Sequence, residues 1–205
     1  MILIVFVLWS GTCPLAGDHW TAERTVRLLQ EPDHLDQATV TTLNYRVAYA
    51  GADGFQIETK GGSPSASDAK SPAQKFDFRS NGTLISSEDT KDPDLERVRR
   101  MVWTATEDRK GLSWSRTWPA VGGLIGADVS VKPSSKTATD TTFAVTYVEA
   151  GKTKGAATVK VFNRVRIVED LSLSLNDVTI PGHVKPGSMV VTEKLKEIHL
   201  QPRVD

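Results

Sequence analysis

Three tryptophans, Trp103, Trp114 and Trp118, lie within sixteen positions of one another and are three of the five in the chain. An indole ring combines a large apolar area with one polar N–H, which suits it to interfaces and to ligand clefts. These three residues are therefore the ligand-binding residues that the sequence predicts. The alternative is that the rings fill a junction between a helix and a sheet.

The motifs yield no catalytic residue. Gly111-Leu112-Ser113-Trp114-Ser115 begins like a nucleophile elbow, but Ser115 stands where that motif has its last glycine. Gly122, Gly123 and Gly126 lack the lysine of a phosphate-binding loop. We therefore expect a protein that is not an enzyme. A secreted hydrolase whose site residues are dispersed along the chain is a further hypothesis.

The potential metal ligands are few and scattered. The four histidines are His19, His34, His183 and His199, and none is within helical reach of another. A zinc site needs three or four ligands of the cysteine, histidine or carboxylate type, and Cys13 is the only cysteine. We expect histidines at the surface, no metal site and no cofactor.

The charge balance argues against nucleic acid as a partner. The chain has 25 Lys and Arg and 25 Asp and Glu, which gives a net charge of zero and no basic excess to bind phosphates. The densest basic cluster, Arg97, Arg99 and Arg100, directly follows three carboxylates at 92–96. This pattern is typical of a solvated helix face.

The first nine residues, Met1–Trp9, are all apolar, and the first charged residue is Asp18. The run is too short for a transmembrane helix, which needs about 20 residues, and it fits the core of a secretory signal peptide over residues 1–17. We expect a secreted or periplasmic protein with no transmembrane span. The alternatives are that the run is a buried first strand, and that Cys13 is lipidated instead of leaving with the signal.

Apolar and polar side chains alternate in several segments, as in strands with one buried face. Turn sequences at 51–54 and 80–83 predict two hairpins, and Asn81 also begins a glycosylation sequon. Residues 61–73 and 149–155 are expected to be loops. With at least seven strand candidates we predict a mainly β fold with an antiparallel, curved or barrel-like sheet. The clearest alternating segments are 43–49, 76–78, 143–147, 157–161 and 171–175.

One helix is well supported. Asp92 can cap it, Pro93 suits its first position, and the apolar residues that follow recur every three to four positions. We expect this helix to end within residues 104–108. A weaker pattern predicts a second helix over Trp20–Gln30, ended by Pro32.

This combination of a signal peptide, a cysteine-poor β-rich chain and an internal helix resembles bacterial envelope proteins with an unclosed half-barrel sheet. Periplasmic lipoprotein carriers are an example. The resemblance concerns the architecture of most of residues 40–200. It implies a curved sheet that wraps a helix and forms an apolar groove for acyl chains.

We therefore expect one β-rich domain over residues 18–205, with one or two helices against its sheet. Its predicted function is non-catalytic binding of a lipid or another hydrophobic ligand in an apolar cleft. The alternative is a structural or protein-interaction module of the cell envelope or the extracellular space, whose partner is another envelope protein. No nucleic-acid partner is expected.

Overall fold

The computed structural model describes residues 13–31, 34–62, 73–87, 92–109, 113–121, 124–180 and 184–203. The apolar run Met1–Trp9 and most of the predicted loop at 61–73 lie outside the described residues. In chain order the elements are β1 (His19–Glu31), β2 (His34–Ala50), β3 (Gly54–Gly62), β4 (Gln74–Arg79), β5 (Leu84–Ser87), α1 (Pro93–Thr106), β6 (Trp114–Trp118), β7 (Ala127–Lys136), β8 (Asp140–Glu149), β9 (Lys152–Phe162), β10 (Ile167–Val178) and β11 (Gly187–His199).

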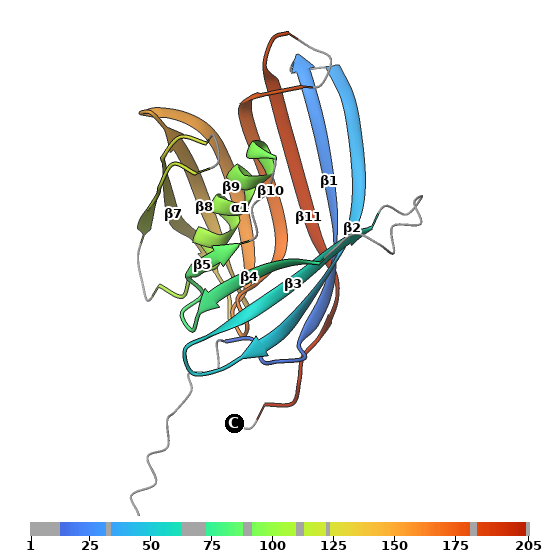
Figure 1. Ribbon diagram of the computed structural model, residues 1–205, viewed down its shortest axis with the longest axis vertical. Helices are drawn as coiled ribbons and strands as arrows, with labels where there is room; N and C mark the ends of the chain where they lie inside the picture. Colours follow the sequence, from blue (N-terminus) through green and yellow to red (C-terminus); the bar gives the residue numbers. More distant parts are fainter. Residues whose placement is uncertain are drawn as a thin grey trace, which may run out of the picture.

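These strands form one antiparallel sheet of eleven, in the order β5-β4-β3-β2-β1-β11-β10-β9-β8-β7-β6. The first and last strands, β1 and β11, pair with each other and so join the two halves of the sheet. The sheet is strongly curved, and α1 lies on its inner side (Figure 1). The predicted curved antiparallel sheet is confirmed.

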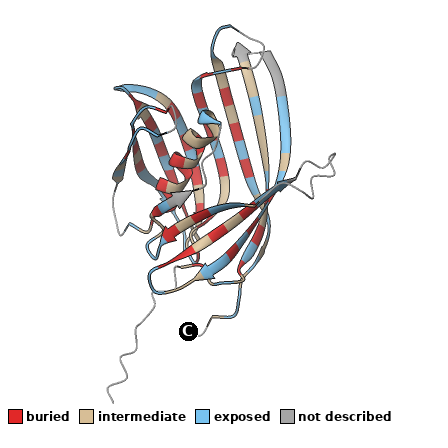
Figure 2. Ribbon diagram, viewed as in Figure 1, coloured by how far each residue is buried: buried red, intermediate tan, exposed pale blue. Residues whose placement is uncertain are grey.

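Period-two alternation separates the two faces of the sheet, because successive side chains of a strand point to opposite sides. In β8, Phe143, Val145 and Tyr147 are buried, whereas Ala144 and Thr146 are exposed. The same alternation runs along most strands (Figure 2). The inner face therefore carries the apolar core and the outer face is polar.

Both hairpins predicted from turn sequences are present, as β2–β3 and β4–β5. The predicted loop at 149–155 is wrong, because the turn between β8 and β9 consists of Ala150 and Gly151 alone. Both residues have positive φ, of 48° and 74°, as tight hairpin turns require. The polar residues after them continue the ladder, so that Gly155 pairs with Tyr147.

The second predicted helix, over Trp20–Gln30, is also wrong, since this segment belongs to β1. Its apolar residues fit the periodicity of a helix and that of a strand, and the neighbouring strands decide between the two. β1 hydrogen-bonds to β2 on one side and to β11 on the other. Two strand partners outweigh a weak local helical preference.

The helix α1 confirms the predicted start and end. The Asp92 side chain accepts hydrogen bonds from the backbone N–H groups of Asp94 and Leu95, at 2.9 and 3.2 Å, and Pro93 is the first helical residue. The helix contacts β6 to β10. In the described part of the chain, no helix is both long and apolar enough to cross a membrane. The buried apolar residues of α1 are Val98, Met101, Val102 and Ala105.

The arginines of α1 do not form a solvated face, so that prediction is wrong. Arg100 is only 1% exposed. The Arg97 guanidinium binds the buried Glu149 carboxylate through two hydrogen bonds, of 2.9 and 2.8 Å, and so attaches α1 to β8. The helix lies inside a concave sheet, and the sheet therefore encloses side chains that a flat surface would leave in water.

The edge strands β5 and β6 are bridged through side chains. Arg116 of β6 donates to the Leu84 carbonyl of β5 at 3.1 Å and to the Glu107 carboxylate at 2.6 Å. Glu107 follows the last turn of α1 and is fully buried. This contact closes the sheet at one end without a backbone ladder.

We expect Gly54→Ala to destabilise the protein by about 1–3 kcal/mol, as overpacking usually does. An added Cβ would stand 1.9 Å from the Phe78 carbonyl oxygen, on backbone that cannot move independently. Gly51→Ala in the same turn is the control, because its Cβ would meet only the Tyr49 ring, which is 59% exposed and can rotate away. Urea denaturation measures both, and equal losses would contradict the packing argument.

Acid should remove the contribution of Glu149 to stability. Burial by itself would raise the pKa of this carboxyl, but hydrogen bonds from Arg97 and Tyr147 outweigh burial and hold the pKa below its usual value. A lowered pKa in the folded state stabilises the protein above the unfolded-state pKa, and this stabilisation disappears as the pH falls through the folded-state pKa. We expect Glu149→Gln to cost about 1–3 kcal/mol at pH 7 and progressively less below pH ~4.

Thermal melts of wild type and Glu149→Gln between pH 7 and pH 3 test this. The control is Glu169→Gln, which removes an exposed partner of Lys160 and should change stability by less than about 1 kcal/mol at any pH. A stability difference for Glu149→Gln that does not shrink in acid would refute the assignment.

Candidate ligand-binding cleft

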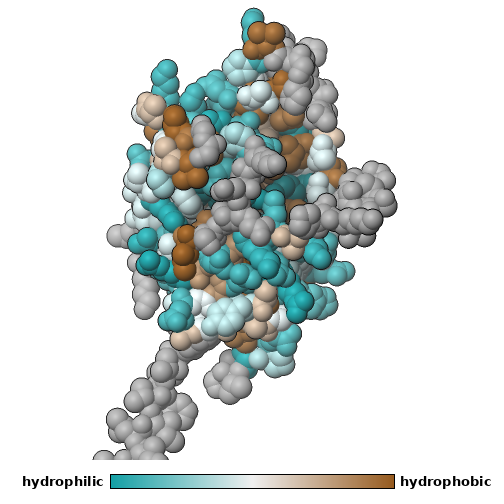
Figure 3. Space-filling view, viewed as in Figure 1, coloured by the Kyte–Doolittle hydropathy of each residue, from teal (hydrophilic) through white to brown (hydrophobic). Residues whose placement is uncertain are grey.

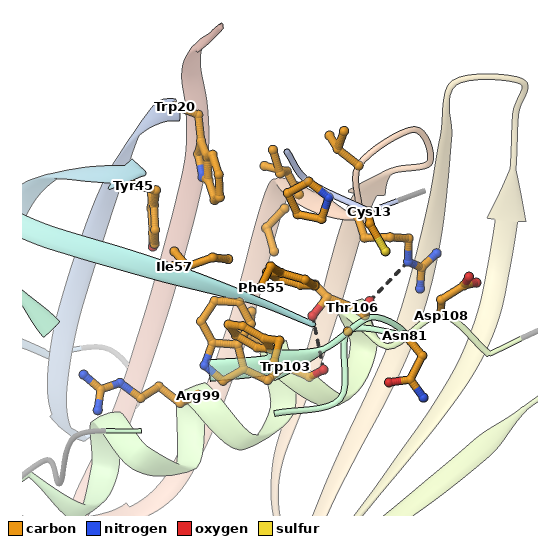
Figure 4. A pocket seen from close by; sticks show the side chains of 18 of the residues that line it. Cys13, Trp20, Tyr45, Phe55, Ile57, Asn81, Arg99, Trp103, Thr106 and Asp108 are labelled. Carbon is orange, nitrogen blue, oxygen red and sulfur yellow. Dashed lines mark hydrogen bonds between the residues drawn. The ribbon is translucent and has the colours of Figure 1, made fainter. Parts of the chain in front are cut away.

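A hollow lies between the inner side of the sheet and α1 (Figure 4). It is narrow, and most of its wall is apolar. We call it the lower hollow. Its large apolar side chains are Trp20, Phe55, Ile57 and Phe78 from the strands, and Val98, Val102 and Trp103 from the helix.

A second hollow, the upper hollow, continues along the inner face toward the far ends of β1 and β11. It is wider and more open, about 1600 Å³ including its solvent-filled mouth. Figure 3 shows brown apolar surface on this upper part of the sheet, beside teal polar surface. Its apolar lining includes Val26, Leu28, Leu43, Phe76, Leu95 and Met189.

The two hollows share four lining residues, Arg24, Tyr45, Arg99 and Trp103. The shared residues place the hollows next to each other, and we treat them as one cleft with a polar waist. The Trp103 ring forms part of the wall of both. It packs edge-on to Phe78, with ring centroids 4.9 Å apart, and tilted against Phe76 at 5.5 Å.

The waist contains a buried hydrogen-bonded group. The Glu193 carboxylate accepts a 2.7 Å bond from Arg24 Nε and a 3.1 Å bond from the Tyr45 hydroxyl. Burial, with the nearby negative charge of Glu193, raises the pKa of Tyr45. Burial would lower the pKa of Arg24, but Tyr45 and Glu193 outweigh it, so that this pKa is raised as well. Tyr45 is therefore a neutral hydrogen-bond donor and Arg24 a permanent cation.

The structure separates the three predicted ligand-binding tryptophans. Trp103 lines both hollows, whereas Trp114 and Trp118 stand on β6, outside the residues that line either hollow. Their indole N–H groups donate to Thr104, to its carbonyl and its hydroxyl respectively, each at 3.1 Å. They pack where α1 meets the sheet. A ligand-binding role for all three stays a prediction, and only Trp103 enters the proposals below.

The other sequence candidates do not assemble into a site. His19 and His199 stack across β1 and β11 with centroids 4.7 Å apart, but the described residues contain no cluster of three or more metal-ligating side chains. Gly111 and Leu112 of the incomplete nucleophile elbow lie outside the described residues. Asn81 is exposed in the β4–β5 turn, where its side chain accepts a bond from the Thr83 N–H at 3.0 Å.

Sequence reasoning missed the charged residues of the cleft, although the pattern contains a signal for two of them. In β1, Arg24 alternates with its neighbours in step with Ala22 and Val26, so its side chain points to the inner face. In β11, Glu193 is in step with Val191 in the same way. A charged side chain on the apolar face of a strand needs a buried partner. Arg24 and Glu193 are opposite each other in the β1–β11 register, 169 positions apart in the sequence.

The sequence matches no protein-family model and no curated protein. Solved structures do share the fold. One, on lipid–protein interactions in lipovitellin, aligns with 93% of this chain at 8% identity and a TM-score of 0.52. This chain spans 26% of that one, and the likeness shows the fold alone.

Two further structures are similar at lower scores. A β-barrel-like protein of the domain of unknown function DUF1849 from Brucella abortus aligns with 93% of this chain and 100% of its own, at 9% identity and a TM-score of 0.46. A protein with a YmcC-like fold from Bacteroides fragilis covers 91% of this chain and 98% of its own, at 11% identity and a TM-score of 0.32.

We expect Arg24→Met and Glu193→Leu each to destabilise the protein, because either leaves an unpaired charge or acceptor at the waist. Removing one partner of a buried ion pair costs about 3–5 kcal/mol, and the lower end applies here because the Arg24 side chain is 22% exposed. The double variant should cost less than the sum of the two, since it removes both charges. A double-mutant cycle from urea denaturation measures this coupling, and additive losses would show that the pair contributes nothing to stability.

Proposed function

We propose that this protein is a secreted or periplasmic, non-catalytic binding protein that holds a lipid or another hydrophobic ligand in the cleft between its curved sheet and α1. The observation that carries the proposal is the lining of that cleft. Aromatic and aliphatic side chains from β1 to β4 face a space that α1 does not fill. The location rests on the predicted signal peptide at 1–17.

The energetics favour a long hydrocarbon chain over a small apolar molecule. Each buried methylene gains about 0.8 kcal/mol, whereas binding costs an estimated 4–15 kcal/mol in lost translational and rotational freedom. A few methylenes are too few to offset that cost. An acyl chain that lies along the apolar wall of the cleft buries many more.

The lipovitellin structure gives secondary support, because its fold occurs in a protein whose interactions with lipid are described. Because the identity is only 8%, the proposed ligand class rests on the cleft of this chain and not on the similarity. The resemblance to periplasmic lipoprotein carriers points to the same class of ligand.

The test uses N-phenyl-1-naphthylamine, a neutral apolar dye that fluoresces when it leaves water. We expect saturable binding by the full-length protein. Val102→Phe should weaken binding at least about fivefold, because the larger ring occupies the lower hollow. Val40→Phe is the control: Val40 lies on β2, is 42% exposed and lines neither hollow, so its dye affinity should equal that of wild type.

Absence of saturable dye binding in the folded wild type would overturn the proposal. So would equal weakening in both variants, because the dye would then not be bound in the cleft. Native mass spectrometry of protein purified from its own host adds a second readout. The expected result is a ligand mass of a few hundred daltons that is lost on denaturation. A chain that carries no small ligand and is bound to an envelope protein would favour the interaction-module hypothesis.

A further inference from the structure

Two buried hydrogen-bond donors in the cleft have no acceptor. Only four buried side-chain nitrogen or oxygen atoms in the described residues lack a hydrogen-bond partner, and two of them are Arg99 Nη1 and Trp103 Nε1. Both residues line both hollows. A buried donor without an acceptor costs about 1–3 kcal/mol, so such atoms call for an explanation, and an unfilled ligand site provides one.

The two donors belong to the same face of α1. Arg99 and Trp103 are four positions apart, which brings their side chains onto neighbouring turns of the helix. In Figure 4 the indole nitrogen of Trp103 lies on the side of its ring that is turned toward Arg99. Both donors therefore lie beside the waist that the two hollows share.

The Arg99 side chain is held in place by other contacts. Its Nη2 donates to the Gln74 side chain, and its guanidinium carbon lies 5.0 Å from the centre of the Phe76 ring. The side chain is only 14% exposed. These contacts orient the guanidinium and leave Nη1 free to donate.

The carboxylates around Arg99 leave its Nη1 without an acceptor at hydrogen-bond distance. Glu96 is shared by two arginines: one oxygen lies 3.8 Å from Arg99 Nη1, and the other lies 3.6 Å from Arg100 Nε. Both distances exceed hydrogen-bond length. Among the other charges of this wall, Arg24 pairs with Glu193 and Asp94 pairs with Arg97. Asp92 caps the helix, and its negative charge also acts on Arg99.

Arg99 is also a poorly solvated cation. Burial lowers the pKa of Arg99, and this effect outweighs the opposing effect of Glu96; Arg24 lowers the pKa further, whereas Tyr45 and Asp92 raise it. A buried cation that shares its counter-ion gains when a second anion binds beside it.

We infer that the ligand is a long-chain amphiphile with a carboxylate head group, of the fatty-acid type, whose two oxygens accept hydrogen bonds from Arg99 Nη1 and Trp103 Nε1. Its hydrocarbon chain extends from this waist into one of the apolar hollows. Two free donors match the two oxygens of one carboxylate. The inference rests on the proposed binding function and adds the chemistry of the head group.

The experiment compares oleate with oleyl alcohol, which has the same chain and a neutral head, in displacing N-phenyl-1-naphthylamine from the full-length protein. A hydrogen bond to a charged group corresponds to roughly tenfold or more in affinity. We expect oleate to bind at least about tenfold tighter than oleyl alcohol. Arg99→Met, which keeps the aliphatic stem, should abolish that advantage by weakening oleate binding much more than oleyl alcohol binding.

Trp103→Phe provides an independent variant, because it keeps an aromatic ring in the wall while it removes the N–H donor together with part of the indole; the ratio of the two affinities isolates the effect on the head group. It should reduce the oleate advantage about threefold to tenfold. The matched control is Arg27→Met on β1, an exposed arginine that lines neither hollow, with both affinities unchanged. Thermal melts establish that each variant is folded.

The possible failures are distinguishable. If the dye binds in the cleft but oleate and oleyl alcohol compete equally, the head-group inference is overturned and the proposed function stands. If neither the dye nor oleate binds to folded protein, the proposed function itself fails. Tighter and more Arg99-dependent binding of oleoyl lysophosphatidic acid than of oleate would replace the carboxylate by a phosphate head and so overturn the assignment.

Discussion

The structure depends on one constraint: a strongly curved sheet has an apolar inner face, and a single helix is too small to cover it. The helix α1 contacts β6 to β10 and buries Val98, Met101 and Ala105 there. On the other half of the sheet, Trp103 and Arg99 of the helix contact β4, and the cleft separates much of the remaining inner face from the helix. An apolar face must be removed from water by some partner, and here the helix accounts for only part of the sheet.

Buried charges fix the parts of this arrangement relative to one another. Arg97 joins α1 to β8 through Glu149, and Arg116 joins the edge strand β6 to β5 and to Glu107. Each of these ion pairs forms only when both residues are in place, because a buried charge without its partner destabilises the fold. They therefore define where the helix lies, and its position sets the size and the lining of the cleft.

The cleft combines apolar walls with a polar waist, and in the function proposed here these two features have separate roles in recognition. Hydrocarbon burial supplies affinity that depends on ligand length and little on ligand identity. The donors on Arg99 and Trp103 supply direction, because a hydrogen bond constrains the position of the head group. Such a division is common in small-molecule sites, which are mostly apolar with a few placed polar groups.

The sequence by itself determined the local structure and the class of the fold. Alternation with period two predicts a curved antiparallel sheet, the turns at 51–54 and 80–83 predict hairpins, and Asp92 with Pro93 predicts the start of α1. Each signal arises from residues within a few positions of one another, which is why it can be read from one chain. The failures at 20–30 and 149–155 are segments whose polar or ambiguous local pattern is overruled by pairing with other strands.

Only the tertiary structure decided the site. It placed Arg24 opposite Glu193 across the β1–β11 pair and turned Arg99 from an apparent solvated charge into a cleft residue. It also separated Trp103 from Trp114, which the sequence had grouped by spacing. The physical reason is that the register of the sheet and the position of α1 determine which side chains are buried and which are paired. Both are set by contacts between residues far apart in the chain.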